Sequence, residues 1–359
     1  MHFAHLLVPL AVKRAFNMKE MNKIRVAVVG AGPSGTSCAM ELLKGGVDCM
    51  LFDRATFPRE KICGGGLTGK SVHLLDRVFP GLQYDYVPVY EIDLLIDGQF
   101  VRTYHLNEPA RIVERRVFDH VLLQEYLKAG GQFVNKGVKE LKETGEGIVL
   151  TLADGEEWLC EWVIGADGAH SRVRKYLQPA YKVSSLCVEQ YMKKEENVDN
   201  RIRVELSVAY KDGYYYDFPN RSHRVIGYGD LNTSVDSFRE ILKARNMEET
   251  RIMGAYIPNE AVYPLHERII LVGDAGGFAS KITGEGLYAA IATGYNASHA
   301  IMEGKPFQET NKALFSKKKR EKIEVRILYS AFGRSMLKWI SRHGRLADRI
   351  LNRYLCHAK

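Results

Sequence analysis

Cysteine is scarce in this sequence, and its placement excludes several kinds of site. Among 359 residues there are six cysteines, with no Cys-x-x-Cys pair and no Cys and His at the spacing of a zinc site. An iron–sulfur cluster needs four thiolates held together, and no such group is present. We therefore expect no metal site, and free thiols favour a cytoplasmic protein. The cysteines are Cys38, Cys49, Cys63, Cys160, Cys187 and Cys356.

A long hydrophobic run is also lacking. The longest apolar stretch covers residues 3–12 and is broken by His5 and Pro9, which leaves it far short of the ~20 residues that a membrane-spanning helix needs. Lys13 and Arg14 follow this stretch, whereas a signal peptide carries its basic residues in front. Because residues 21–25 read as an ordinary start, we expect residues 1–20 to be an upstream start or a loose extension. A membrane-touching N-terminal helix is the alternative.

Negative charge is nearly absent from the C-terminal part of the chain. Residues 311–359 hold fourteen Lys or Arg and three Asp or Glu, a net +11, so the first 310 residues carry a net −3. Leu328, Phe332, Met336 and Ile340 recur every four residues, which predicts helices in the region 306–359. Arg345, Arg349 and Arg353 form a basic stripe beside Leu346, Ile350 and Tyr354.

Two interpretations of this basic tail stay open. The first is a set of helices packed on the body of the protein with a solvated basic face. The second is a peripheral contact with an anionic membrane surface. We expect no nucleic-acid binding, because no aromatic side chains are interleaved with the charges.

A glycine-rich turn lies between the first two predicted strands. Residues 24–29 and 47–52 form apolar runs typical of buried parallel strands, and residues 36–44 read as the helix between them. Gly30, Gly32 and Gly35 have the spacing of a dinucleotide-binding turn, and Asp53 lies 18 residues beyond Gly35. The sequence therefore predicts a nucleotide site here, with Pro33, Ser34 and Arg54 beside these residues.

Two further glycine–acid pairs close apolar runs in the same way. Asp167-Gly168 follows residues 163–166, and Gly273-Asp274 follows residues 269–272. An acid at the carboxyl end of a parallel strand faces the ligand crevice of such a sheet. Gly284, Glu285 and Gly286 then open a helix, whose N-terminus stabilises negative charge. Three such motifs in this order fit a long phosphate-bearing cofactor, and we predict FAD.

The predicted fold class is α/β. We expect a Rossmann-like FAD-binding domain with an inserted, discontinuous antiparallel-sheet substrate domain and a C-terminal helical tail. The FAD-binding domain would take residues 21–83, 114–178 and 259–305. The substrate domain would take residues 84–113 and 179–258, with strands over 203–210, 214–218 and 224–228. Residues 118–129 and 285–302 show the periodicity of helices.

The run from Asp167 to Arg174 resembles the A-D-G-x-x-S-x-V-R motif of flavoprotein hydroxylases and their relatives. With the glycine motifs, it resembles the p-hydroxybenzoate hydroxylase-type FAD fold. Arg115, three residues before Phe118, matches the arginine that this superfamily places near the cofactor. An arginine at the surface end of a helix is the plainer interpretation.

Three more motifs resemble those of the geranylgeranyl reductase family. Residues 57–67 match its PRxKxCGGGL loop, and residues 283–287 match its (T/S)GEG helix start. Residues 214–219 are similar to its YxWxFP motif, with Tyr216 where Trp is usual. The resemblance covers roughly residues 24–305, and the size and basic C-terminal region are more like the compact CbrA-type bacterial members. It implies reduction of carbon–carbon double bonds in an isoprenoid-like apolar small molecule.

Candidate residues for the reaction come from the loop and the aromatic motif. Gly64 and Gly65 carry no Cβ, so the backbone can lie flat against a flavin ring. Cys63 would sit at the ring's edge, to position substrate or deliver a proton, or simply to pack as a small buried residue. Tyr214, Tyr216 and Phe218 alternate and so share one face of a strand. We expect them to contact the substrate, with Tyr216 a second catalytic candidate; a plain sheet core is the alternative.

Several functions remain compatible with these motifs. Since there is no second Gly-x-Gly-x-x-Gly, NAD(P)H would bind only transiently, and a ferredoxin-type donor is equally allowed. A flavin monooxygenase would share the same FAD motifs, and a flavin halogenase is weaker because both tryptophans of its WxWxIP motif are missing. A non-catalytic flavin electron carrier or lipid-binding protein is a rival of another class. The sequence leaves the oligomeric state open.

Overall fold

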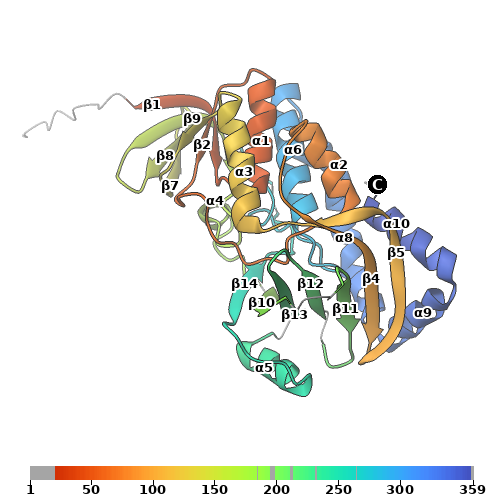
Figure 1. Ribbon diagram of the computed structural model, residues 1–359. Coiled ribbons are helices and arrows are strands. Elements are labelled where there is room, and N and C mark those ends of the chain that lie inside the picture. The colour runs from red at the N-terminus through yellow and green to blue at the C-terminus, as the bar shows by residue number, and fades with distance from the viewer. Residues whose placement is uncertain are drawn as a thin grey trace, which may run out of the picture.

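The strands of the protein form two sheets, with helices on and between them (Figure 1). A computed structural model describes residues 21–183, 185–194, 199–210, 213–230, 233–263 and 265–356. The predicted N-terminal extension lies outside the described residues.

The first sheet has the strand order β6-β2-β1-β9-β8-β7, and β15 pairs with β9. β1 pairs in parallel with β2 and β9, and β15 runs parallel to β9, so the carboxyl ends of these strands meet at one edge. β7 and β8 are antiparallel additions. The strands are β1 (Asn22–Val29), β2 (Cys49–Phe52), β6 (Gln132–Val134), β7 (Val138–Glu143), β8 (Ile148–Leu152), β9 (Glu157–Gly165) and β15 (Ile269–Leu271).

Helices cover this sheet and bury its apolar side chains. α1 and α6 pack against each other, and α3 lies beside α1 (Figure 1). α1 begins at Pro33, three residues before the predicted start, because proline fits the first turn of a helix. The helices are α1 (Pro33–Lys44), α2 (Gly69–Val78), α3 (Arg115–Lys128), α4 (Arg172–Leu177), α6 (Leu287–Glu303) and α7 (Phe307–Thr310).

The second sheet has the order β14-β10-β13-β12-β11-β4-β5-β3, in which β11 and β4 are the parallel pair. The predicted strand over 203–210 ends at Leu206, because residues 207–210 form a turn closed by Tyr210 N–H to Ser207 O at 3.1 Å. The elements are β3 (Gly66–Leu67), β4 (Val87–Ile96), β5 (Gln99–Ile112), β10 (Ser185–Lys193), β11 (Ile202–Leu206), β12 (Tyr214–Pro219), β13 (His223–Asp230), β14 (Met253–Ile257) and α5 (Val235–Ala244).

Three helices close the chain and pack on β4 and β5 (Figure 1). They are α8 (Lys312–Leu328), α9 (Ala331–Arg342) and α10 (Gly344–Cys356). The predicted four-residue spacing is interrupted between α8 and α9, where the Ser330 hydroxyl accepts from Gly333 N–H at 3.0 Å and caps α9. The parallel sheet, the second sheet and the helical tail confirm the predicted fold class. Within the described residues, no helix is long and apolar enough to cross a membrane.

Candidate functional site

The turn after β1 is shaped by glycines that admit no side chain. Gly30 has a φ of +111°, and a Cβ there would lie 2.3 Å from the Ala166 carbonyl oxygen at the end of β9. A Cβ on Gly35 would lie 1.8 Å from the Gly30 carbonyl oxygen. These two glycines therefore let α1 and the ends of β1 and β9 approach one another closely.

Gly32 differs, because a Cβ there would contact one flexible side chain and no backbone. It is the N-cap of that helix, and no side chain caps the first turn. A Cβ on Gly32 would meet only the Arg59 guanidinium, at 3.3 Å. Uncapped amides at a helix N-terminus, with a guanidinium beside them, form a cradle suited to phosphate oxygens. Gly32 and Arg59 thus border the predicted pyrophosphate position.

Asp53 stands at the rim of this cradle, directly after β2. Its carboxylate accepts from Ala31 N–H at 2.7 Å and from Ala55 N–H at 2.8 Å, which fixes its orientation. Arg54 is exposed. Ser34 is buried, and its hydroxyl oxygen lies 2.9 Å from where a Cβ on Gly273 would be. The first and third glycine–acid motifs are therefore neighbours.

The Asp167 carboxylate accepts hydrogen bonds from residues that follow it in the same loop. It accepts from the Ser171 hydroxyl at 2.5 Å and from Arg172 N–H at 2.7 Å, and burial raises its pKa. Gly168 follows with a φ of +76°. Arg174 donates to the Asp274 carbonyl oxygen at 2.9 Å. Arg174 thus connects the Asp167-Gly168 motif to the Gly273-Asp274 motif. In the sequence, Arg174 was identified only as the last residue of the A-D-G-x-x-S-x-V-R motif.

Asp274 faces the Gly-rich loop and the start of α6. Lys61 Nζ lies 3.5 Å from its Oδ2, and its Oδ1 lies 3.7 Å from where a Cβ on Gly286 would be. Gly286 is the N-cap of α6, again with no side-chain cap. Gly284 has a φ of +60° and lies against the Tyr214 hydroxyl. An uncapped helix N-terminus beside a lysine provides positive potential at this point.

Glu285 points away from these groups into a buried network. Its carboxylate pairs with Lys70 Nζ at 2.8 Å and accepts from the Thr68 hydroxyl at 2.6 Å. Lys70 is 5% exposed and also donates to the Tyr354 carbonyl oxygen in α10. Glu285 therefore connects the start of α6 to α2 and to the tail.

The Gly-rich loop packs closely against the second sheet. A Cβ on Gly64 would lie 2.7 Å from the Phe218 ring, and one on Gly65 would lie 2.0 Å from the Val113 carbonyl oxygen. Gly66 and Leu67 continue the loop as β3, which pairs with β5. The loop backbone therefore lies directly against the aromatic motif, as the three glycines require.

Arg115 is buried and held by two carboxylate contacts. Its Nε and a terminal nitrogen donate to the two oxygens of Asp119 at 2.7 and 2.8 Å. Burial opposes the charge of Arg115, but Asp119 and the adjacent Cys63 thiol raise its pKa. Arg59 also donates to Asp119, at 3.2 Å. The cluster joins the phosphate cradle to Cys63, so Arg115 lies at the predicted site and not at the surface.

The aromatic side chains of β12 form a continuous row. The ring centroids of Tyr214 and Tyr216 are 6.0 Å apart, and those of Tyr216 and Phe218 are 5.1 Å apart. The Tyr214 hydroxyl donates to the Thr283 carbonyl oxygen at the start of the Gly284–Gly286 turn. The predicted shared face is confirmed, and the row runs from the start of α6 to the Gly-rich loop.

Glu189 on β10 is a site residue that the sequence analysis missed. Its side chain is fully buried (0% exposed), and burial raises its pKa. It accepts from Cys63 N–H at 3.0 Å and from the Tyr216 hydroxyl at 2.8 Å. Its carboxyl group thus accepts hydrogen bonds from both catalytic candidates, Cys63 and Tyr216.

The contact between Tyr216 and Glu189 crosses a whole strand. Both residues are in register with Gly227 on β13, which lies between β10 and β12. A Cβ on Gly227 would lie 2.1 Å from the Tyr216 ring, so only glycine leaves room for the ring to reach across. Glu189 could have been noticed as a charged residue inside the apolar run 186–192. Its partner Tyr216 lies 27 residues later, so no local pattern predicts the contact.

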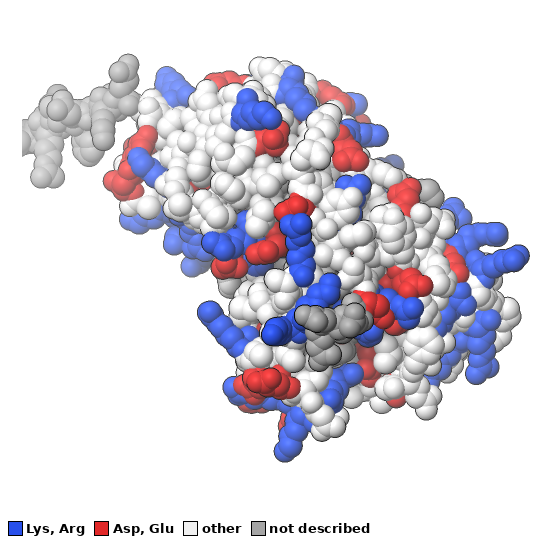
Figure 2. All heavy atoms as spheres, viewed as in Figure 1, with Lys and Arg blue, Asp and Glu red and all other residues white. Residues whose placement is uncertain are grey.

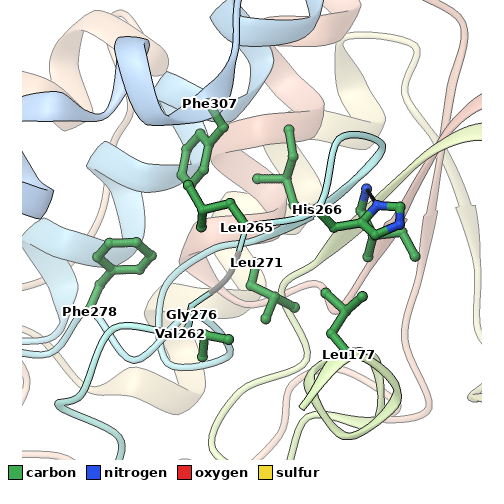
Figure 3. Close-up of a pocket in the computed structure, with 10 residues that line it drawn as sticks. Leu177, Val262, Leu265, His266, Leu271, Gly276, Phe278 and Phe307 are labelled. Atoms are coloured by element: carbon green, nitrogen blue, oxygen red, sulfur yellow. Dashed lines mark hydrogen bonds between the residues drawn. The ribbon is translucent and has the colours of Figure 1, made fainter.

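An apolar pocket behind β15 lies apart from these residues. Its cavity volume of about 10 Å³ has room for a single water molecule at most. His266 is the ionisable residue of its lining, and its Nδ1 already accepts from Ile269 N–H at 3.0 Å. The pocket is lined by Leu177, Val262, Leu265, His266, Ile269, Ile270, Leu271, Gly276, Phe278 and Phe307 (Figure 3). It belongs to the core and not to the cofactor site.

Comparisons with known proteins agree with this geometry. Residues 23–194 match the family model of an FAD binding domain. A geranylgeranyl diphosphate reductase of Rhodobacter capsulatus is 30% identical over 306 residues, which cover 78% of this chain and 76% of that protein. The chloroplastic geranylgeranyl diphosphate reductase of Arabidopsis thaliana is 28% identical over 318 residues, covering 79% of this chain and 66% of that protein.

Solved structures share the fold at lower identity. A geranylgeranyl bacteriochlorophyll reductase-like protein of Thermoplasma acidophilum superposes with a TM-score of 0.67 at 19% identity, over 93% of this chain and 91% of that chain. p-Nitrophenol 4-monooxygenase PnpA of Pseudomonas putida gives a TM-score of 0.74 at 15% identity, over 94% of this chain and 100% of that chain. Reductases and monooxygenases thus share this architecture, which by itself does not choose between them.

Proposed function

Because this chain belongs to the geranylgeranyl reductase family of FAD-dependent oxidoreductases, we propose that it reduces carbon–carbon double bonds of an isoprenoid-type apolar substrate. The observation that carries the proposal is the aromatic row of β12, which lies against the Gly-rich loop beside a site that fits FAD. Such a row offers an apolar wall to a chain of alkene units.

The fit to FAD rests on two uncapped helix starts and the residues around them. Gly32 leaves the space before α1 open to a pyrophosphate, with Arg59 at its edge and Asp53 at its rim. At the other end of the site, Asp274 contacts Lys61 and lies beside Gly286, the N-cap of α6. When bound and reduced, FAD would supply a hydride. NAD(P)H or a ferredoxin-type donor would reduce it in a transient encounter.

The chain's own part is to orient the substrate, exclude water and supply a proton. Tyr216 and Phe218 border the loop on the substrate side, and the raised pKa of Tyr216, caused by burial, keeps its hydroxyl protonated. Cys63 lies on the loop itself, where its thiol contacts Arg115. These positions are compatible with proton delivery to one alkene carbon while the other receives the hydride.

We expect the FAD-loaded protein, reduced with dithionite without oxygen, to be reoxidised by geranylgeranyl diphosphate. The product should gain two hydrogens for each bond reduced, as mass spectrometry would show. The saturated analogue serves as the control, since it offers no alkene and should leave the flavin reduced.

A different outcome would assign one of the other functions. A product that forms only with oxygen, and carries an added oxygen atom, would identify a monooxygenase. A flavin that no apolar alkene reoxidises would favour an electron carrier or a lipid-binding protein.

A further inference from the structure

The tail helices expose large apolar side chains on their outer faces. Their inner faces are used, since Val325, Tyr329 and Ala347 are buried against the second sheet. On α9, Phe332, Met336 and Trp339 recur at helical spacing, and they are 72%, 41% and 57% exposed. Single exposed apolar residues are ordinary, but a row with phenylalanine and tryptophan on one helix face indicates a contact surface.

α8 and α10 also expose apolar side chains, and we call the exposed apolar residues of the three helices the tail face. Two isoleucines lie one turn apart on α8, and a leucine and an isoleucine lie one turn apart on α10, each at least 45% exposed. The tail face consists of Ile323, Ile327, Phe332, Met336, Trp339, Leu346 and Ile350.

The charges around the tail face are almost all positive. Within α8–α10, Glu324 is the one acidic side chain that the structure exposes, and Asp348 is paired with Arg102 at 2.7 Å. Figure 2 shows Lys and Arg side chains along the edge where Figure 1 places α9 and α10. The exposed basic residues of these helices are Lys312, Lys319, Arg320, Lys322, Arg326, Arg342, Arg345, Arg349 and Arg353.

We propose that the tail face docks on an anionic lipid bilayer, with its apolar side chains in the interface and its basic ones on the headgroups. Amphipathic helices with tryptophan and phenylalanine beside lysine and arginine bind such surfaces. A second copy of this chain is a poorer partner, because its tail face repeats the same positive charge.

The test is cosedimentation of the full chain with vesicles of phosphatidylcholine alone or mixed with phosphatidylglycerol. Wild-type protein should bind the anionic vesicles and be released by high salt. The double variant Phe332→Ser and Trp339→Ser should bind at least about tenfold more weakly. Val117→Ser with Tyr256→Ser, at exposed positions on α3 and β14 (42% and 44%), is the control and should bind as wild type.

Two results would overturn the lipid proposal. One is equal binding by the tail-face variant and the control. The other is a wild-type dimer, seen by sedimentation, that the tail-face variant converts to a monomer, since the surface would then join two copies of the chain. Thermal unfolding of both variants confirms that they fold, and neither result depends on catalytic activity.

Discussion

Replacing Gly32 with valine is expected to abolish FAD binding while leaving the fold intact. Gly32 has extended backbone angles that any residue adopts, and a Cβ there would meet only the Arg59 guanidinium at 3.3 Å. The valine methyl groups would therefore occupy the cradle before α1 without disturbing the core. We expect FAD affinity, measured by quenching of flavin fluorescence, to fall at least about 100-fold, or about 2.7 kcal/mol.

Two other glycine substitutions separate this effect from a loss of structure. Gly254→Ala on β14 places its Cβ no closer than 3.6 Å to other atoms and should bind FAD as wild type does. Gly35→Val should fail to fold, because its Cβ would lie 1.8 Å from the Gly30 carbonyl oxygen. Normal FAD affinity in a folded Gly32→Val protein would mean that the cofactor does not bind at this cradle.

This contrast among glycines also shows how far the sequence was informative. Gly30, Gly32, Gly35 and Asp53 belong to one β-α-β unit, so their spacing alone predicts where they lie. The role of each glycine was harder to predict, since the close approach at Gly30 is to Ala166 at the end of β9, more than a hundred residues further along. The spacing of these residues along the chain predicts the local β-α-β structure. Close packing depends also on strands that are distant in the sequence.

The acids of the later motifs illustrate the same limit. The sequence placed Asp167 beside the cofactor because it closes an apolar run, and Glu285 because it opens a helix between two glycines. Their carboxylates are held by partners in the chain, Asp167 by the start of α4 and Glu285 by Lys70, which lies 215 residues earlier. No local pattern pairs residues so far apart. The Tyr216–Glu189 contact across Gly227 was hidden for the same reason.

Lys70 lies where three separate parts of the chain meet, and its removal should lower the stability of the fold strongly. It belongs to α2, pairs with Glu285 at the start of α6, and donates to the Tyr354 carbonyl oxygen in α10 at 3.3 Å. The rings of Tyr288 and Tyr354 lie 4.9 and 4.8 Å from its ammonium group. Few lysines are so enclosed, and each of these contacts offsets the cost of burying its charge.

Lys70→Met is therefore expected to lower the free energy of unfolding by about 3–5 kcal/mol, because it leaves the Glu285 carboxylate buried without its cation. Urea denaturation followed by circular dichroism would measure the loss. The double variant Lys70→Met with Glu285→Gln should recover most of it, since no unpaired charge remains. Lys128→Met is the matched control, because its pair with Glu125 is exposed and worth about 0–1 kcal/mol.

The same variant tests whether the tail depends on this pair. With Lys70 gone, α10 loses the hydrogen bond to Tyr354, so its amides should exchange with solvent faster than in Lys128→Met. An unfolding midpoint equal to that of Lys128→Met would show that the buried pair adds nothing to stability. Unchanged exchange in α10 with a lowered midpoint would show instead that the pair stabilises α2 and α6 alone, and that the tail is held by its packing on β4 and β5.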